Sequence, residues 1–334
     1  MSTTLTPITL LTGFLGSGKT SLLKRMIHQP QFARCAVIIN EFGDVGLDQA
    51  LVSDSADDQD IQLLDSGCLC CQSSSAIQDV LSGLYYKRLR KEIPWFDRVL
   101  IETSGLAEPG PIINSILGDS SLNRQYRVGG VITTFDASFG EQDTNTYDTA
   151  ELQLMMADTI VLTKLDLPSS QSTPALEEWL KHKVPAARVL NNRLPDGELA
   201  QALLQTADHA LAPVIEGHNL RANSPLKHLF TYGISSLVVD LPKPVSWPAW
   251  ADFVRHIQTH FGEQLLRLKG VIQFEKAEDI RTVHAVHHLF SAPEPATAIP
   301  KHLIGKLVFI VRDLEHDCIQ QAVEQLRHAP NNPN

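Results

Sequence analysis

The chain has few cysteines, no membrane-length apolar run and little basic charge, and each shortage argues against a class of protein. Its 334 residues include five cysteines, an odd number that favours a reducing compartment over a disulfide framework. No apolar run reaches the roughly 18 residues of a membrane span, and the first residues lack the features of a signal peptide. The 28 basic and 38 acidic residues give a net charge of −10, which argues against a nucleic-acid binder. We therefore expect a cytoplasmic protein that binds neither nucleic acid nor membrane.

The first motif is GFLGSGKT, which matches the phosphate-binding P-loop pattern G-x-x-x-x-G-K-[ST] in full. The apolar run 8–12 before it predicts a buried strand, and the spacing after it predicts a helix that stops before Pro30. Its glycines let the backbone wrap around phosphate, Lys19 would reach the outer phosphates, and Thr20 would bind Mg²⁺. The residues that we assign to the nucleotide here are Gly13, Gly16, Ser17, Gly18, Lys19, Thr20 and Ser21.

A second and a third motif follow predicted strands. The strand 98–101 ends at Glu102, where a carboxylate beside a P-loop holds Mg²⁺ or positions water, and the N–H of Gly105 can approach the terminal phosphate. The strand 157–163 leads to Lys164 and Asp166, of which the aspartate can accept the two guanine N–H groups and the lysine stem can cover the base. Guanine sites usually begin this motif with Asn instead of Thr, so GTP is favoured and ATP stays the alternative. Asn191 or its neighbour Asn192 would lie near the base.

The fourth motif is SGCLCCQ, which gathers three thiols, at Cys68, Cys70 and Cys71. A structural zinc site uses four ligands, commonly two C-x-x-C pairs, and the sequence holds no second pair. Three thiolates suit a metal that must leave again, and Glu41 or Asp44 of the preceding glycine-containing segment, where a nucleotide-sensing switch belongs, could complete the site. Two alternatives stay open: a redox disulfide in the C-x-x-C spacing of the outer cysteines, and a packed structural turn.

The second half of the chain shows no independent catalytic motif. Its pattern predicts a small α+β domain whose segment 279–290 forms one strand, which makes the histidines of that segment structural or weakly metal-interacting. The histidines of the preceding Pro- and Gly-containing segment match no ligand spacing and are interpreted as exposed linker residues. We place a P-loop domain at 1–205, a linker at 206–228 and the C-terminal domain at 229–328.

In this order, GFLGSGKTSLLKRM, NEFGDVGLD, SGCLCCQ, IETSGLAEPGPI and TKLD resemble the CobW-type metallochaperone GTPases, including the YjiA-like members. The resemblance spans nearly the whole chain, because LLRLKGVI and KLVFIVRDL look like strands of that family's C-terminal domain. It implies a SIMIBI-class P-loop GTPase domain with a mainly parallel sheet flanked by helices, plus a smaller C-terminal α+β domain. It also implies a homodimer.

The resemblance further implies slow, Mg²⁺-dependent GTP hydrolysis, coupled to delivery of zinc or cobalt to a client metalloprotein. By motif match, the catalytic residues are Lys19, Glu102 and Asp44, and the three thiols hold the metal. Ile39 stands where some relatives carry a further acid, and the chain lacks the His-rich run of many members. A metal-sensing regulatory GTPase and a nucleotidase with a thiol redox switch are the competing interpretations.

Overall fold

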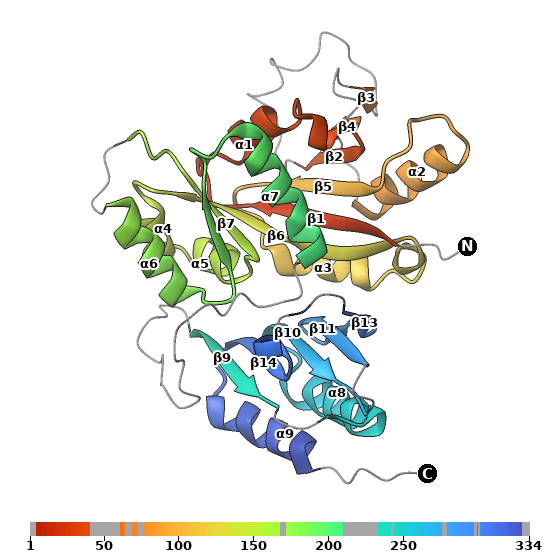
Figure 1. Cartoon of the computed structure of the whole chain (residues 1–334), viewed down its shortest axis with the longest axis vertical. Helices are drawn as coiled ribbons and strands as arrows, with labels where there is room; N and C mark the ends of the chain where they lie inside the picture. Colours follow the sequence, from red (N-terminus) through yellow and green to blue (C-terminus); the bar gives the residue numbers. More distant parts are fainter. Residues whose placement is uncertain are drawn as a thin grey trace. The chain divides into compact units, whose positions relative to one another are not determined.

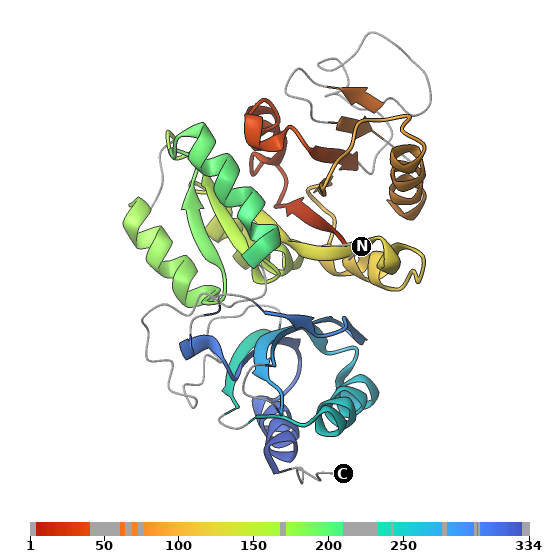
Figure 2. The same ribbon diagram turned by 45° about the vertical axis from the view of Figure 1, so that its right-hand side comes forward.

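The computed structural model of the chain describes residues 5–40, 61–63, 69–72, 77–167, 172–209, 233–241, 244–275, 279–296, 299 and 301–328. The chain divides into two compact units, one with residues 1–177 and 189–208 and the other with residues 178–188 and 209–334. Each unit has its own sheet and its own buried apolar cluster (Figures 1 and 2). None of the helices in these described ranges is both long and apolar enough to cross a membrane.

The first unit is built on an eight-stranded sheet in the order β3-β4-β2-β5-β1-β6-β7-β8. The six strands from β4 to β7 in this order pair in parallel, whereas β3 pairs antiparallel with β4. The strands are β1 (Thr6–Thr12), β2 (Cys35–Asn40), β3 (Ile61–Leu63), β4 (Leu69–Gln72), β5 (Arg98–Thr103), β6 (Tyr126–Asp136), β7 (Thr159–Thr163) and β8 (Arg188–Asn191). Strands β1 and β7 are buried along their whole length, as a parallel sheet covered by helices on both faces requires.

Helices cover both faces of this sheet. Leu22 of α1 and Leu203 of α7 pack into one apolar cluster with Leu100 of β5, so these two helices share a face. The crossovers that carry α2, α3 and α5 step across the sheet in the opposite direction from that of α1, and right-handed crossovers therefore place them on the other face. The helices are α1 (Lys19–Met26), α2 (Ile77–Leu89), α3 (Pro109–Leu117), α4 (Gly140–Thr146), α5 (Asp148–Met155) and α7 (Asp196–His209), with short 3₁₀ turns at Pro30–Phe32 and Leu122–Arg124. Helix α6 (Thr173–Lys183) begins in the first unit and ends in the second.

The carboxyl ends of the parallel strands bring the predicted site residues to one edge. There β1 runs into the P-loop, β5 carries Glu102, β6 ends at Asp136, β7 is followed by Lys164 and β8 ends at Asn191. Open parallel sheets bind their ligands at this edge, because loops and helix N-termini converge there. The predicted fold class, a P-loop domain with a mainly parallel sheet and a smaller second domain, is confirmed.

The second unit contains an antiparallel sheet in the order β12-β11-β10-β14-β9, with β13 paired to β11. Ser246 caps the N-terminus of helix α8: its hydroxyl accepts a hydrogen bond from the N–H of Ala249 at 3.3 Å, and Pro248 occupies the first turn. The elements are β9 (Ile234–Asp240), α8 (Trp247–Phe261), β10 (Leu265–Gln273), β11 (Ile280–Val286), β12 (Leu289–Phe290), β13 (Glu294–Pro295), a 3₁₀ turn (Lys301–Leu303), β14 (Lys306–Arg312) and α9 (His316–His328).

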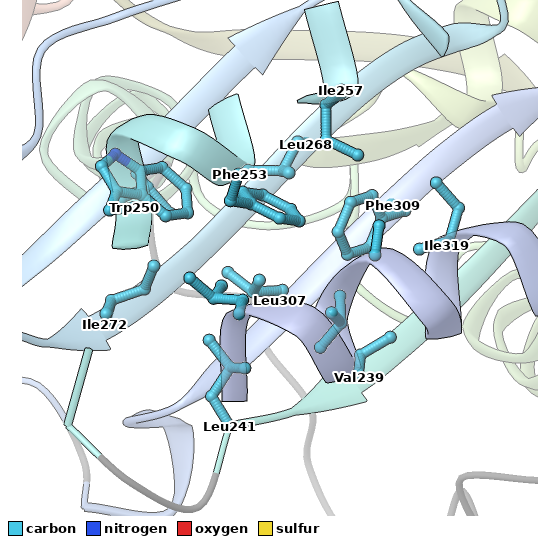
Figure 3. Close-up of a cluster of buried hydrophobic side chains, with 14 of the residues drawn as sticks. Val239, Leu241, Trp250, Phe253, Ile257, Leu268, Ile272, Leu307, Phe309 and Ile319 are labelled. Atoms are coloured by element: carbon cyan, nitrogen blue, oxygen red, sulfur yellow. The ribbon is translucent and has the colours of Figure 1, made fainter. Parts of the chain in front are cut away.

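Aromatic side chains fill the space between α8 and this sheet (Figure 3). Trp250 stacks on Phe253 with ring centroids 5.3 Å apart, and Phe253 meets the ring of Phe309 from β14 edge-on at 6.5 Å. Ile319 of α9 is fully buried in the same cluster. Because the members of the cluster are apolar, they stabilise the unit and supply no catalytic or metal-binding groups.

Two details differ from the sequence prediction. Segment 279–290 is a hairpin and not one strand, because β11 ends at Val286 and a turn at His287 and His288 leads into β12. His287 adopts φ 50°, in the left-handed region, which reverses the chain. Its pKa is lowered by burial and further by His288 and Arg312. In addition, α7 continues through His209, so the first residues of the predicted linker are helical, and residues 210–228 lie outside the described residues.

Candidate functional site

The P-loop is clamped against the end of β6. Gly16 and Gly18 have φ angles of 69° and 91°, and Gly13 has φ 141°, values that side chains rarely allow. A Cβ on Gly13 would lie 2.3 Å from Oγ1 of Thr134 and 2.5 Å from its carbonyl oxygen. The hydroxyl oxygens of Ser17 and Thr134 lie 2.7 Å apart, within hydrogen-bonding distance. The loop therefore keeps its shape through close backbone contact with β6 as well as through its own glycines.

The first turn of α1 carries the predicted phosphate lysine and the predicted Mg²⁺ threonine. The side chain of Lys19 is buried, and its Nζ donates to the carbonyl oxygens of Gly13 at 2.8 Å and Phe14 at 3.2 Å. The hydroxyl of Thr20 donates to Oε1 of Glu102 at 2.5 Å. Glu102 is 3% exposed at the end of β5. Oxygen ligands from a hydroxyl and a carboxylate are those that Mg²⁺ takes in P-loop proteins, so this pair fits the ion.

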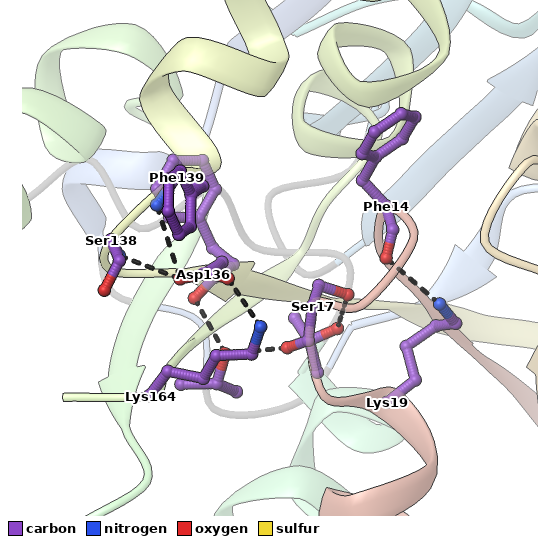
Figure 4. A network of polar contacts seen from close by, with 10 residues as sticks. Phe14, Ser17, Lys19, Asp136, Ser138, Phe139 and Lys164 are labelled. Carbon is purple, nitrogen blue, oxygen red and sulfur yellow. Dashed lines mark hydrogen bonds and ion pairs between the residues drawn. The ribbon is translucent and has the colours of Figure 1, made fainter. Parts of the chain in front are cut away.

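An ion pair between the ends of β6 and β7 is a site feature that the sequence analysis missed (Figure 4). Nζ of Lys164 lies 2.7 Å from Oδ2 of Asp136, whose side chain is 7% exposed, while Oδ1 accepts hydrogen bonds from the N–H groups of Ser138 at 2.8 Å and Phe139 at 3.4 Å. Lys164 adopts φ 54°, which costs a non-glycine residue on the order of 1 kcal/mol. Its Nζ lies 3.9 Å from where a Cβ of Gly16 would be, so the lysine reaches the P-loop.

Thr163 stands where guanine sites usually have Asn, and it also braces the P-loop. It is buried, and its hydroxyl donates to the carbonyl oxygen of Ser17 at 2.7 Å, with the carbonyl oxygen of Phe135 at 3.1 Å. The hydroxyl therefore joins the end of β7 to the loop and to β6. The residues predicted to select the base, Lys164 and Asp166, follow directly after it.

The junction of α4 and α5 borders the same edge. Burial raises the pKa of the Asp143 carboxyl, the nearby charge of Asp136 raises it further, and Lys164 opposes both effects. The ring of Tyr147 stacks on Phe14 of the P-loop with centroids 4.9 Å apart. One lysine and two carboxyls thus share this corner, and a pair of aromatic rings packs beside them.

Gly105 packs against the backbone of the P-loop. A Cβ at this position would lie 2.8 Å from Cδ2 and 2.9 Å from Cα of Leu15. The buried amide of Gln153 on α5 donates to the carbonyl oxygens of Gly105 at 3.0 Å and Ala107 at 2.9 Å. Gln153, which the sequence analysis also missed, therefore anchors the segment that follows Glu102 beside the loop.

The residues predicted for the guanine base lie on two neighbouring loops. Asp166 is exposed in the turn after β7, and Asn191 ends β8. Oδ1 of Asn191 accepts a hydrogen bond from the N–H of Arg193 at 3.2 Å, and the guanidinium of Arg193 donates to the carbonyl oxygen of Leu165. Arg193 therefore joins the two loops. Ser21 lies exposed in the first turn of α1.

The thiol motif is described only in part. Cys68, Glu41 and Asp44 lie outside the described residues. Cys70 and Cys71 belong to strand β4. Among the residues that the structure describes, no group of three or more His, Cys, Asp or Glu side chains is arranged to hold a metal ion. The three-thiol site stays a prediction.

Strand β2 separates the thiol strand from the strand that carries Glu102. Cys71 lies in register with Ile38 of β2, and Ile38 lies in register with Ile101, the residue before Glu102. Because neighbouring strands are 4.7–4.9 Å apart, β4 and β5 are about 10 Å apart. The predicted switch segment follows β2 directly in the sequence. The thiol strand and the predicted Mg²⁺ carboxylate are thus parts of one sheet.

We expect Asp136→Asn to weaken GDP binding about 3- to 10-fold, or about 1 kcal/mol. The amide oxygen can still accept the hydrogen bonds of Ser138 and Phe139, but the charge that holds Nζ of Lys164 is gone. Titration with a fluorescent GDP analogue measures the change. Asp148→Asn, an exposed acid of the same region, is the matched control and should bind like the unaltered protein. Unchanged GDP affinity in Asp136→Asn would show that the ion pair takes no part in nucleotide binding.

Comparison with known proteins identifies the family of the chain. Residues 7–191 match the model of the CobW/HypB/UreG nucleotide-binding domain, and residues 234–327 match that of the cobalamin synthesis protein cobW C-terminal domain. The chain belongs to the CobW family. The two matched ranges cover both units, so the family assignment rests on most of the chain and not on the P-loop alone.

The chain is similar in sequence to proteins whose names state a role. It is 32% identical to zinc chaperone YjiA of Escherichia coli K12 over 96% of this chain and 98% of YjiA. It is also 32% identical to zinc-regulated GTPase metalloprotein activator 1 of Schizosaccharomyces pombe, over 52% of this chain and 42% of that protein. The crystal structure of Zn(II)-bound YjiA GTPase from E. coli superposes with a TM-score of 0.70 at 31% identity, over 97% of this chain and 99% of that one.

Proposed function

We propose that this CobW-family protein is a cytoplasmic, GTP-hydrolysing metallochaperone. It binds a transition metal, zinc or cobalt, at Cys68, Cys70 and Cys71, with Glu41 or Asp44 completing the site, and delivers it to a client metalloprotein. The observation that carries the proposal is the shared sheet, in which only β2 lies between the thiol strand β4 and the strand β5 that carries Glu102. The names of two relatives, a zinc chaperone and a zinc-regulated GTPase metalloprotein activator, favour zinc as the cargo.

Hydrolysis is proposed as in-line attack of water on the terminal phosphate. The P-loop backbone and the N-terminus of α1 would hold the phosphates, and the ammonium of Lys19 would counter their charge. Thr20 and Glu102 would hold Mg²⁺, which when bound neutralises charge on the phosphate oxygens. The contact of 2.5 Å between their oxygens supports a joint role. Asp166 and the Lys164 stem would select guanine, and Asn191 would lie near the base.

The proposed chaperone activity depends on coupling between metal binding and nucleotide binding. Hydrolysis can drive metal release only if the GTP and GDP states bind the metal with different affinity. Strand β2 supports such coupling, because it pairs with the thiol strand on one side and with the Glu102 strand on the other. The switch segment after β2, which includes Glu41 and Asp44, would then respond to the terminal phosphate and alter the metal site.

A second copy of this chain is the proposed assembly partner. Five large apolar side chains around the P-loop edge are between 45% and 60% exposed. Each lies beside a residue of the site. Leu15 belongs to the P-loop, Leu106 follows Gly105, and Leu167 follows Asp166. Phe139 donates its N–H to Asp136, and Tyr147 stacks on Phe14. Exposed apolar residues gathered at one edge are typical of an interaction surface, which supports a homodimer that meets across the nucleotide.

The deciding experiment is a titration of zinc and cobalt into the reduced protein in three states: without nucleotide, with GDP, and with a non-hydrolysable GTP analogue. We expect thiolate–cobalt absorption, and a metal affinity that differs at least about fivefold between the nucleotide states, or about 1 kcal/mol of coupling. Sedimentation of the same samples reports whether the GTP analogue favours a dimer. Cys70→Ala should abolish the thiolate absorption, whereas Cys318→Ala, which changes a cysteine of α9, should leave it unchanged.

The other outcomes separate the competing functions. Tight metal binding that is equal in all nucleotide states would contradict chaperone coupling. Nucleotide-dependent metal binding with no transfer to any client would favour a metal-sensing regulatory GTPase. A disulfide that forms readily and changes hydrolysis, without metal binding, would favour a thiol redox switch.

A further inference from the structure

Two histidines lie one turn apart on helix α8 of the second unit. His256 and His260 are at positions i and i+4, and their rings stack with centroids 4.4 Å apart and an angle of 30° between the planes. Side chains at this spacing lie on the same face of a helix. A histidine pair at i and i+4 is an arrangement that binds zinc in proteins, because one metal ion can reach both rings.

The hydrogen bond of His260 fixes which of its nitrogens can bind a metal. Nδ1 of His260 lies 3.0 Å from the carbonyl oxygen of His256. A carbonyl oxygen only accepts, so Nδ1 carries the proton. In the neutral ring, Nε2 therefore has the free lone pair. In metal-binding histidines, the ring nitrogen that does not contact the metal commonly donates a hydrogen bond to a nearby acceptor. This hydrogen bond orients the ring and raises the basicity of the nitrogen that binds the metal.

Burial and neighbouring charges of both signs surround the pair. Burial lowers the pKa of His256 and the neighbouring His260 lowers it further, so both effects disfavour the protonated ring. Two carboxylates flank the pair along the helix: Asp252 lies one turn before His256 and Glu263 lies just beyond the end of α8. Asp252 is held by Arg255 at 2.9 Å.

We propose that His256 and His260 form a two-histidine site for zinc on the surface of the C-terminal unit. Zinc takes imidazole nitrogens at 2.0–2.1 Å in a tetrahedral arrangement, which puts two such nitrogens about 3.4 Å apart. The stacked rings, with centroids 4.4 Å apart, would turn so that one ring nitrogen of each faces the same ion. Two protein ligands leave two coordination positions for water or for another ligand. The ion therefore stays exchangeable, as a transit site for cargo metal requires; that use, unlike the site itself, rests on the proposed function.

The test uses the full chain with Cys68, Cys70 and Cys71 all changed to Ser, so that the proposed thiolate site is absent. Zinc is titrated in competition with a chromophoric chelator, with GDP and excess Mg²⁺ present to occupy the P-loop oxygens. We expect one equivalent of zinc to bind, and the Cε1 proton resonances of both histidines to shift in NMR spectra. His260→Asn should weaken this binding at least about 10-fold, or about 1.4 kcal/mol, although its amide can still donate to the carbonyl oxygen of His256.

Matched variants test whether the zinc binds at these two histidines. His256→Ala should lose the same equivalent, whereas His302→Ala, which removes an exposed histidine of a 3₁₀ turn, should retain it. Thermal unfolding of each variant shows whether it is folded. Full zinc binding by His260→Asn would overturn the site, and so would a folded cysteine-free chain that binds no zinc. Neither result bears on the thiolate site, which that chain lacks.

Discussion

Gly13→Ala is expected to abolish nucleotide binding while the C-terminal unit stays folded. A methyl group on Gly13 would lie 2.3 Å from Oγ1 of Thr134, 2.5 Å from the carbonyl oxygen of Thr134 and 2.7 Å from Oγ of Ser17. The hydroxyls could rotate away, but the carbonyl belongs to the backbone of β6 and cannot. The φ of 141° at Gly13 adds strain for any side chain. The P-loop must therefore leave the position in which its N–H groups can hold phosphate.

The expected loss of GDP affinity in Gly13→Ala is at least about 100-fold, or about 2.7 kcal/mol. Calorimetric titration with GDP measures it, and circular dichroism confirms that the variant is folded. Gly83→Ala is the matched control, because a Cβ at this position of α2 would meet no atom within 4 Å. Helix propensity makes that change neutral or slightly stabilising. Affinity within twofold of the unaltered protein in Gly13→Ala would contradict the clamp between the loop and β6.

The parts of the site that the sequence predicts are local in the chain. The P-loop, Glu102 and Lys164 each combine a buried strand with a polar residue at its end, within a few residues of sequence. The carboxyl ends of parallel strands meet at one edge, so the same reasoning brings these three segments together. The structure places all three at that edge. Their roles in binding and catalysis stay predictions.

The parts that the sequence analysis missed depend on contacts between distant segments. Thr134 lies 117 positions from its partner Ser17, and Gln153 lies 48 positions from Gly105. No periodicity in a single sequence pairs such residues, because folding determines which strand ends become neighbours. Asp136 is different: it ends a buried apolar strand just as Glu102 does, and that pattern could have identified it.

The sequence analysis missed the hairpin in the second unit for a different reason. His287 and His288 form its turn although neither is a residue that typically marks one, and His287 takes a left-handed φ that favours Gly or Asn. The apolar residues on both sides continue the strand pattern, so periodicity alone predicts one strand. The turn is held by tertiary contact, because the amide of Gln258 on α8 donates to the carbonyl oxygen of His288 at 2.8 Å.

Glu102→Gln is expected to slow GTP hydrolysis by about 100-fold or more. The amide keeps the shape of the side chain and an oxygen that can accept the hydrogen bond of Thr20, so the change removes charge with little change in packing. If Glu102 has its predicted roles, the loss of that charge weakens Mg²⁺ binding and the positioning of water. The Mg²⁺ concentration at half-maximal hydrolysis should therefore rise. GDP affinity measured without Mg²⁺ should stay the same.

Single-turnover release of phosphate, measured across a range of Mg²⁺ concentrations, separates the two contributions of Glu102. A rate that recovers at high Mg²⁺ assigns the carboxylate to the ion, and a rate that stays low assigns it to the water. Glu108→Gln, an exposed acid at the start of α3, is the control and should hydrolyse GTP normally. If Glu102→Gln hydrolyses GTP at the normal rate and Asp44→Asn does not, the catalytic carboxylate belongs to the switch segment. The contact of Thr20 with Glu102 would then be structural, and coupling would run from the switch to the thiols without β5.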